Sequence, residues 1–182
     1  MKGRRVDMSS TETIVKREQG ENVIYKNSGI CRIAEIKSMS FAPGEEKTYY
    51  ILEPIYSQGS RTYVPVDSVE LNACMRSLLD QKQIDDVITQ SQTQELEWVA
   101  DTKQRAVYWN DVISTYDRAK ILAVMLCLNE HKLKLEKNRK KMYASDLKTL
   151  SLTERMIKDE FAFVLKIHRD EVMDYINERL SK

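Results

Sequence analysis

The pattern of hydrophobic and polar positions changes once along the chain, near Leu71. Between Gly20 and Val66, apolar and polar residues alternate in short runs, most clearly from Ile30 to Ile36. This alternation predicts short β-strands, and the glycine, asparagine, serine and proline residues between the runs predict tight turns at 26–29, 42–45 and 57–60. A segment this short suits a small antiparallel β-barrel.

Two prolines indicate that this β-rich segment has an open edge. Pro54 and Pro65 cannot donate a hydrogen bond to an interior ladder, so we place them at strand ends or on edge strands. An edge strand can pair with a strand of another protein.

From Asp80 onward the apolar residues recur at helical spacing. The pattern predicts a bundle of about five helices, with Asp80, Ser145 and Asp170 as N-caps of the first, fourth and fifth. The second helix is predicted from about Leu96 to Tyr116, with an inward stripe at Val99, Ala106, Trp109, Ile113 and Tyr116. The third is predicted from Asp117 to Lys137, and its apolar stretch 121–128 belongs in the middle of the bundle.

These elements predict an α+β protein with two domains. Residues 1–16 are polar without a sustained period and are interpreted as a flexible leader. Residues 17–72 form the β domain, and residues 73–182 form the all-α helical domain.

Composition limits the partners and the compartment. The 29 basic side chains nearly cancel the 28 acidic ones and leave a net charge of +1. Any DNA contact must therefore be local or be brought about by a partner protein. The three cysteines are widely separated in apolar surroundings, which is typical of reduced core thiols. Residues 1–10 show no apolar h-region of the kind found in signal peptides, and no apolar run is long enough for a bilayer, so we expect a cytoplasmic protein without membrane contact.

No catalytic signature is present in the sequence. The glycines form neither a dinucleotide fingerprint nor a phosphate loop, and no nucleophile elbow or zinc-binding histidine pair occurs. His131 and His168 are each predicted near a helix end, in capping or surface roles. We therefore expect no enzyme activity, no metal, no cofactor and no small-molecule substrate.

Aromatic and basic residues gather on the second predicted helix. Trp98, Arg105 and Trp109 are seven and eleven residues apart and fall on nearly one helical face, with Lys103 nearby. An aromatic ring beside cations can wedge against an unstacked base while the cations hold phosphates, but packing is the alternative. We interpret Trp109 as core and leave both readings open for Trp98.

An ordered set of short motifs runs along about residues 17–180. The motifs are Gly20–Tyr25, Gly29–Ile36, Tyr49–Leu52, Tyr63–Pro65, Arg76, Trp98, Arg105, Tyr116–Asp117, Lys140–Lys141, Asp146 and Glu160–Leu165. Taken together, the set resembles the bacterial CarD/CdnL family of transcription regulators. The specificity lies in the order of the set rather than in any one motif.

The resemblance implies a Tudor-like N-terminal domain, shared with transcription-repair coupling factors, that docks on the RNA polymerase β subunit by strand pairing. It implies a C-terminal helical domain that contacts promoter DNA at the upstream fork of the bubble, where a tryptophan props open the minor groove. The polymerase-binding residues expected on this basis are Met39, Arg61, Thr62 and Tyr63, and the DNA-binding residues are Trp98, Lys103, Arg105 and Lys148.

The sequence departs from the family pattern at some of these positions. Polymerase-facing arginines of the family fall at Met39 and Tyr63 here, and Arg61 can supply the charge from the same strand face. Counting back from Asp117 without a gap puts the wedge position at Thr102, one helical turn from Trp98, and we assign the wedge to Trp98.

The resemblance and the residues together favour a polymerase-bound regulator that stabilises the open complex through non-sequence-specific contacts with the minor groove and phosphates. The alternative is an interaction adapter on polymerase that never contacts DNA, which the neutral charge and the acids beside Trp98 favour.

Overall fold

The computed structural model describes residues 15–42, 44–57 and 59–181. The chain divides into two compact units between Ser77 and Leu78, here called unit 1 and unit 2. Most of the predicted leader, residues 1–14, lies outside the described residues, as do Pro43 and Gln58 of two predicted turns.

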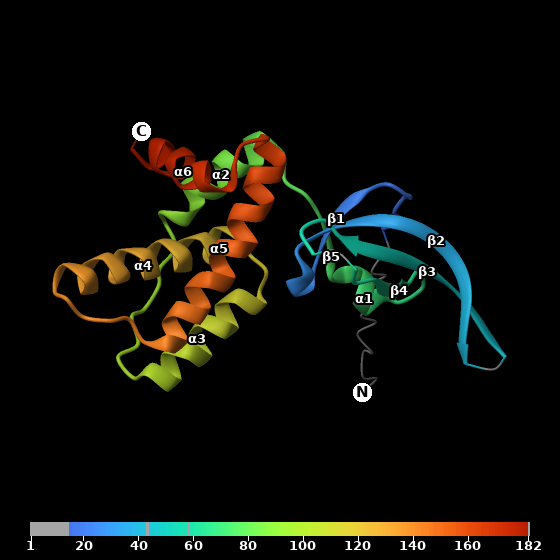
Figure 1. Ribbon diagram of the computed structural model, residues 1–182, viewed down its shortest axis with the longest axis horizontal. Helices are drawn as coiled ribbons and strands as arrows, with labels where there is room; N and C mark the ends of the chain where they lie inside the picture. The colour runs from blue at the N-terminus through green and yellow to red at the C-terminus, as the bar shows by residue number, and fades with distance from the viewer. Residues whose placement is uncertain (1–14, 43, 58, 182) are drawn as a thin grey trace, which may run out of the picture. The chain divides into compact units, whose positions relative to one another are not determined.

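Unit 1 is an antiparallel sheet with one short helix (Figure 1). Its elements are β1 (Asn22–Tyr25), the 3-10 turn η1 (Lys26–Ser28), β2 (Ile30–Ala42), β3 (Glu45–Pro54), β4 (Thr62–Pro65), α1 (Val69–Ala73) and β5 (Met75–Ser77). The described strands are ordered β4-β3-β2-β1-β5, with β4 and β5 at the two edges. This sheet is open, so the closed barrel predicted from the sequence is not confirmed.

One face of the sheet carries the core of unit 1. The core cluster on this face is formed by Val23, Tyr25, Cys31, Ile33, Tyr50, Leu52, Val64 and Met75. They alternate along each strand with residues of the opposite face, as the period-two pattern predicted. Both prolines lie at strand ends, Pro54 closing β3 and Pro65 closing the edge strand β4, also as predicted.

Two features of unit 1 differ from the sequence-based expectation. The β2–β3 hairpin is longer than the short strands expected, because pairing continues past the core through polar positions, where the Ser38 and Thr48 hydroxyls lie 3.0 Å apart. The unit also extends beyond residue 72, because β5 pairs with β1. Arg17 holds this edge, donating to the Ser77 hydroxyl and the Met75 carbonyl.

Cys31, Cys74 and Cys127 are all free, and of the three only Cys31 is buried, whereas Cys74 and Cys127 are half-buried. Burial raises the pKa of the Cys31 thiol from 9.0 to about 11. We expect Cys31 to react with iodoacetamide at pH 8.5 about 100-fold more slowly in the folded chain than in the urea-unfolded chain, because only the thiolate reacts. Peptide mass spectrometry measures both rates, and equal rates would contradict the burial.

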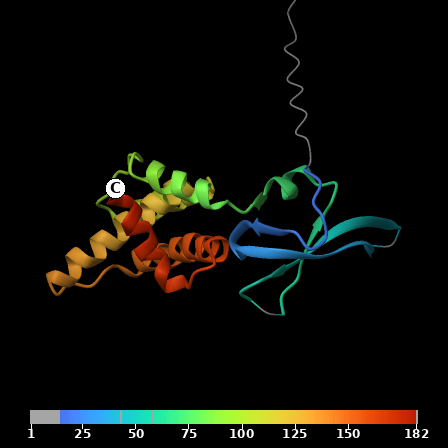
Figure 2. The same cartoon turned by 90° about the horizontal axis from the view of Figure 1, so that it is seen from above.

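Unit 2 is helical. Its elements are α2 (Gln81–Ser91), α3 (Thr102–Ser114), α4 (Arg118–Lys137), α5 (Ala144–Leu165), the 3-10 turn η2 (Arg169–Glu171) and α6 (Val172–Leu180). The described part of the unit thus holds the predicted five α-helices. In Figures 1 and 2, α5 packs against both α3 and α4, and α6 packs against α2.

The core of unit 2 follows the predicted helical stripes. Trp109 is fully buried, and the stretch 121–128 on α4 is almost entirely inside. Asp80 forms a capping box with Gln83 at the start of α2, as predicted, and Asp117 caps α4.

Three helix starts differ from the prediction. Helix α3 begins at Thr102 rather than near Leu96, because the Asp101 carboxylate accepts hydrogen bonds from the Lys103 and Gln104 amides. Helix α5 is one continuous helix whose N-cap position is Tyr143, so the predicted cap, Ser145, lies inside it.

At the start of the last helical segment, the predicted cap Asp170 is also replaced. His168 caps η2, with Glu171 completing a capping box, and α6 follows directly. No helix of the described residues is long and apolar enough to cross a membrane.

Candidate functional site

The outer side of β4 is available to a partner strand at Tyr63. The Val66 amide donates to the Thr48 carbonyl of β3 at 2.9 Å. Because successive residues of a strand direct their backbone groups to opposite sides, the groups of Thr62 also face β3, whereas those of Tyr63 face away from the sheet.

This edge ends at Pro65. Proline has no N–H, and the Pro65 carbonyl, which faces outward, already accepts a hydrogen bond from Asn72 Nδ2 at 2.9 Å. Asn72 is buried, and its Nδ2 also lies 2.6 Å from the Ser68 carbonyl. A partner strand would therefore pair along 61–63 and stop there.

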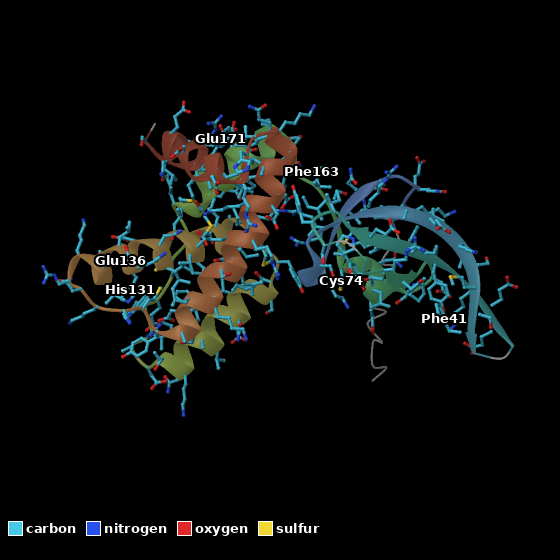
Figure 3. All side chains as sticks on the ribbon, in the orientation of Figure 1. Phe41, Cys74, His131, Glu136, Phe163 and Glu171 are labelled. Carbon is cyan, nitrogen blue, oxygen red and sulfur yellow. The ribbon has the colours of Figure 1, made fainter. Side chains whose placement is uncertain are left out.

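Beside this edge lies an aromatic surface, formed by Phe41, Tyr49 and Tyr63. The Phe41 ring meets the edges of the other two rings at centroid distances of 5.2 and 5.4 Å. Phe41 is 62% exposed and Tyr63 is 38% exposed. Figure 3 labels Phe41 toward the far end of β2. Such an exposed cluster presents apolar area without charge.

The strand register places the four predicted polymerase-binding residues. Met39, half-buried on β2, shares the face of the aromatic surface, and so do Arg61 and Tyr63. Thr62 is opposite Leu52 of the core, so its side chain is on the other face. Arg61 pairs with Glu53, Nη2 to Oε1 at 2.7 Å, so its charge is locally compensated.

In unit 2, Trp98 lies in the loop before α3 and is 38% exposed. Its ring centroid is 4.1 Å from that of His131 on α4 and 6.4 Å from that of the buried Trp109. The Arg105 guanidinium carbon lies 4.7 Å from the same ring. Trp98 is thus neither buried nor freely mobile: three neighbours hold one part of it while another part faces solvent.

Arg105 is the residue that fixes this loop. Its guanidinium forms a bidentate ion pair with Asp146 on α5, in which Nε donates to Oδ1 at 3.1 Å and Nη2 donates to Oδ2 at 2.7 Å. Its Nη1 donates to the carbonyls of Val99 at 2.7 Å and Ala100 at 3.0 Å. The hydrogen bond with Asp146 raises the pKa of Arg105 above its ordinary value, so the side chain stays charged.

The position of Arg105 corrects its expected role. Arg105 is only 2% exposed, and its partner Asp146 is completely buried. A guanidinium enclosed in this way has no surface to offer a phosphate, which argues against the direct DNA contact expected from the sequence. Its geometry suits a positioning role instead, since it links the Trp98 loop to α5.

Unlike Arg105, the two lysines predicted to contact DNA lie at the surface. Lys103 on α3 and Lys148 on α5 are both exposed. The ammonium groups of both lysines are therefore on the surface of unit 2. Glu95 and Glu97, on either side of Leu96 in the Trp98 loop, are also exposed and carry the opposite charge.

Sequence reasoning missed two aromatic neighbours of this cluster. His131, expected near a helix end in a capping or surface role, lies within α4 and stacks on Trp98. Tyr143 is 63% exposed, and its ring centroid is 5.9 Å from the Arg105 guanidinium carbon. The available signal for Tyr143 was its position directly after the densest basic stretch of the chain. His131 carried no comparable signal, because its contact crosses from one helix to a distant loop.

Among the described residues, no group of three or more His, Cys, Asp or Glu side chains is arranged to hold a metal ion. The buried charges form ion pairs within the helical unit, Arg105 with Asp146 and Glu160 with the half-buried Arg118. The structure thus offers two candidate contact surfaces. Unit 1 has a short free strand edge with aromatic side chains, and unit 2 has a half-exposed tryptophan in a loop that an internal ion pair holds.

Comparison with known proteins matches the first of these surfaces to a family. Residues 18–79 match the family model of the CarD-like/TRCF RID domain. A comparison with curated proteins found no match. The matched segment contains every strand of unit 1, including the edge strand β4. Residues 18–79 of this chain are therefore similar to the CarD-like/TRCF RID domain, which agrees with the resemblance that the motifs indicated.

Proposed function

We propose that this chain is a non-enzymatic transcription regulator that binds the RNA polymerase β subunit through unit 1 and stabilises the promoter open complex through unit 2. The observation that carries the proposal is the match of residues 18–79 to the CarD-like/TRCF RID domain, with a strand edge in that segment whose Tyr63 backbone faces outward. A regulator of this kind acts in the bacterial cytoplasm, at the nucleoid.

On the polymerase side, strand pairing along 61–63 supplies the main-chain hydrogen bonds. The aromatic surface then contacts apolar side chains of the β subunit next to the paired strand. Arg61 contributes less charge than an unpaired arginine would, because Glu53 compensates it. Binding should therefore depend on aromatic contacts and shape more than on salt.

On the DNA side, Trp98 acts as the wedge at the upstream fork of the bubble, with Lys103 and Lys148 near phosphates. Arg105 contributes by holding the Trp98 loop in one conformation, which removes the cost of ordering it on binding. The neutral net charge of the chain fits this arrangement, because tethering to polymerase raises the local concentration to roughly millimolar.

The experiment that tests the proposal is a titration of the full chain against the purified cognate β subunit, followed by fluorescence anisotropy. Saturable binding with one chain per subunit is the expected result. If no saturable binding occurs, the polymerase part of the proposal is wrong.

The buried position of Arg105 and the exposed Glu95 and Glu97 favour a second candidate, an adapter that binds polymerase without contacting DNA. Replacing Trp98 separates the two functions. We expect Trp98→Ala to shorten the open-complex lifetime about tenfold, the effect of a loss of about 1.4 kcal/mol of differential binding. Polymerase–promoter lifetime after heparin challenge measures this.

The control for Trp98→Ala is Lys82→Gln, an exposed substitution on α2, which should leave the lifetime unchanged. Both variants should bind the β subunit as the unaltered chain does. An unchanged lifetime for Trp98→Ala would favour the adapter.

A further inference from the structure

The segment that joins α4 to α5 carries a basic turn, defined here as residues 137–141. Lys137, Arg139, Lys140 and Lys141 are all exposed, and the remaining residue, Asn138, is uncharged. In the described part of the chain, no carboxylate forms an ion pair with these four side chains, whereas Lys134 nearby is paired with Glu130. A chain of net charge +1 thus concentrates four positive charges in five consecutive residues.

The backbone of the basic turn is fixed. The Arg139 amide donates to the Glu136 carbonyl at 3.0 Å and the Lys140 amide donates to the Leu135 carbonyl at 2.9 Å. Asn138 Nδ2 donates to the Lys134 carbonyl at 2.8 Å, and Arg139 has a left-handed φ of 54°. The side chains therefore leave the end of α4 from a defined turn rather than from a loose loop.

The helix dipole accounts for only part of this basic charge. Cations in the last turn of a helix stabilise its C-terminus, which explains Lys134 and Lys137. The effect falls off beyond the last turn, so it gives no reason for the three further cations at 139–141. Those three are available for an external anion.

An exposed aromatic ring follows the basic turn after one residue, Met142. Tyr143 occupies the N-cap position of α5, makes no capping hydrogen bond with its side chain and is 63% exposed. The guanidinium of Arg105 lies near the Tyr143 ring and also near the Trp98 ring. In Figure 1 the segment between α4 and α5 runs back to the end of unit 2 where α3 begins, and Figure 3 labels His131 and Glu136 on the preceding helix.

We propose that the basic turn and Tyr143 bind single-stranded DNA, with phosphates on the cations and an unpaired base stacked on the Tyr143 ring. Cations on a defined turn, close in sequence to an exposed aromatic ring, supply the two features with which proteins hold single strands. This inference rests on the proposed function, because the open bubble is the source of an unpaired DNA strand next to the fork.

The aromatic ring distinguishes a single strand from other anionic partners. In a duplex each base is covered by its neighbours, so a flat ring gains no stacking partner unless a step is opened. An acidic protein or an anionic membrane surface would engage the cations and leave the Tyr143 ring without a base to stack on. Single-stranded DNA uses both features at once.

The test uses the full chain without polymerase and a fluorescein-labelled mixed-sequence 12-nucleotide DNA strand, at low salt, read by anisotropy. We expect the single strand to bind at least about tenfold more tightly than the same sequence as a duplex. Tyr143→Ala should weaken single-strand binding about tenfold, and Tyr143→Phe should retain it, because stacking needs the ring and not the hydroxyl.

The charge contribution is measured with a second variant and a matched control. Lys140→Gln with Lys141→Gln should reduce the slope of log affinity against log salt by about 1.4, since each phosphate contact on a single strand contributes about 0.7. Lys82→Gln, exposed on α2, should change neither affinity nor slope. Circular dichroism checks that every variant is folded.

Three results would overturn the inference: equal or tighter binding of the duplex, single-strand binding that Tyr143→Ala leaves unchanged, or equal competition by polyglutamate. Absence of DNA binding at low salt would also overturn it. None of these depends on the polymerase titration, so a failure here is distinguishable from a failure of the proposed function.

Discussion

Replacing Arg105 by methionine is expected to lower the free energy of unfolding of unit 2 by about 3 to 5 kcal/mol, because the fully buried Asp146 carboxylate would lose its partner. The Val99 and Ala100 carbonyls would lose their donor as well. Urea denaturation followed by the fluorescence of the two tryptophans of unit 2, Trp98 and Trp109, measures the loss.

Two further variants make this result specific. Lys103→Met removes an exposed cation from the same helix and should change the free energy of unfolding by no more than about 0.5 kcal/mol. Arg105→Met combined with Asp146→Leu should recover most of the stability, because a buried ion pair replaced by apolar residues leaves no unpaired charge. A loss below about 1 kcal/mol for Arg105→Met alone would show that Arg105 does not hold the loop.

Replacing Tyr63 by proline is expected to weaken binding to the polymerase β subunit about 100-fold, a loss of about 2.7 kcal/mol. The Tyr63 N–H faces away from β3, so proline removes a donor to the partner strand without breaking a hydrogen bond inside the sheet. The same change removes one ring of the aromatic surface.

Tyr63→Ala separates these two effects, since it keeps the N–H and removes the ring. Its affinity for the β subunit should lie between those of the unaltered chain and Tyr63→Pro. Phe41→Ala, on the neighbouring strand, should also weaken binding, because Phe41 is exposed and contacts Tyr63. Unaltered affinity for Tyr63→Pro in a folded chain would mean that polymerase binds elsewhere.

Much of the fold was predictable because each half has one dominant period. The alternation along Ile30–Ile36 includes the buried Ile30, Cys31 and Ile33, although Ile36 is exposed. In the predicted helical stripe, Trp109 and Ile113 are buried, whereas Val99 lies before the helix. The strand ends at Pro54 and Pro65 followed from the missing N–H of proline. These are local properties, which a single sequence carries.

The errors came from interactions between distant residues. The start of α3 depends on whether Asp101 caps the helix. The irregular loop before α3 is held by Arg105, and Arg105 is itself held by an ion pair with Asp146 on α5. On a helical wheel Arg105 looked like a surface cation beside Trp98, but its partner is far along the chain. The openness of the sheet likewise depends on how the edge strands β4 and β5 pair, which periodicity does not determine.

The candidate site was predictable to the same extent. Trp98 could be named from composition and resemblance, whereas its contact with His131 could not, because that contact joins a loop to α4. The strand 61–63 could be named as an edge from Pro65, but the closure of its end by Asn72 required the structure.

If polymerase binding by unit 1 delivers unit 2 to the open bubble, breaking that binding should remove the effect on the bubble. The deciding experiment compares the open-complex lifetime of the cognate polymerase with the unaltered chain, with Tyr63→Pro and with no addition. We expect the unaltered chain to lengthen the lifetime and Tyr63→Pro to return it close to the baseline. A lifetime that the unaltered chain does not change, or that Tyr63→Pro lengthens equally, would contradict it.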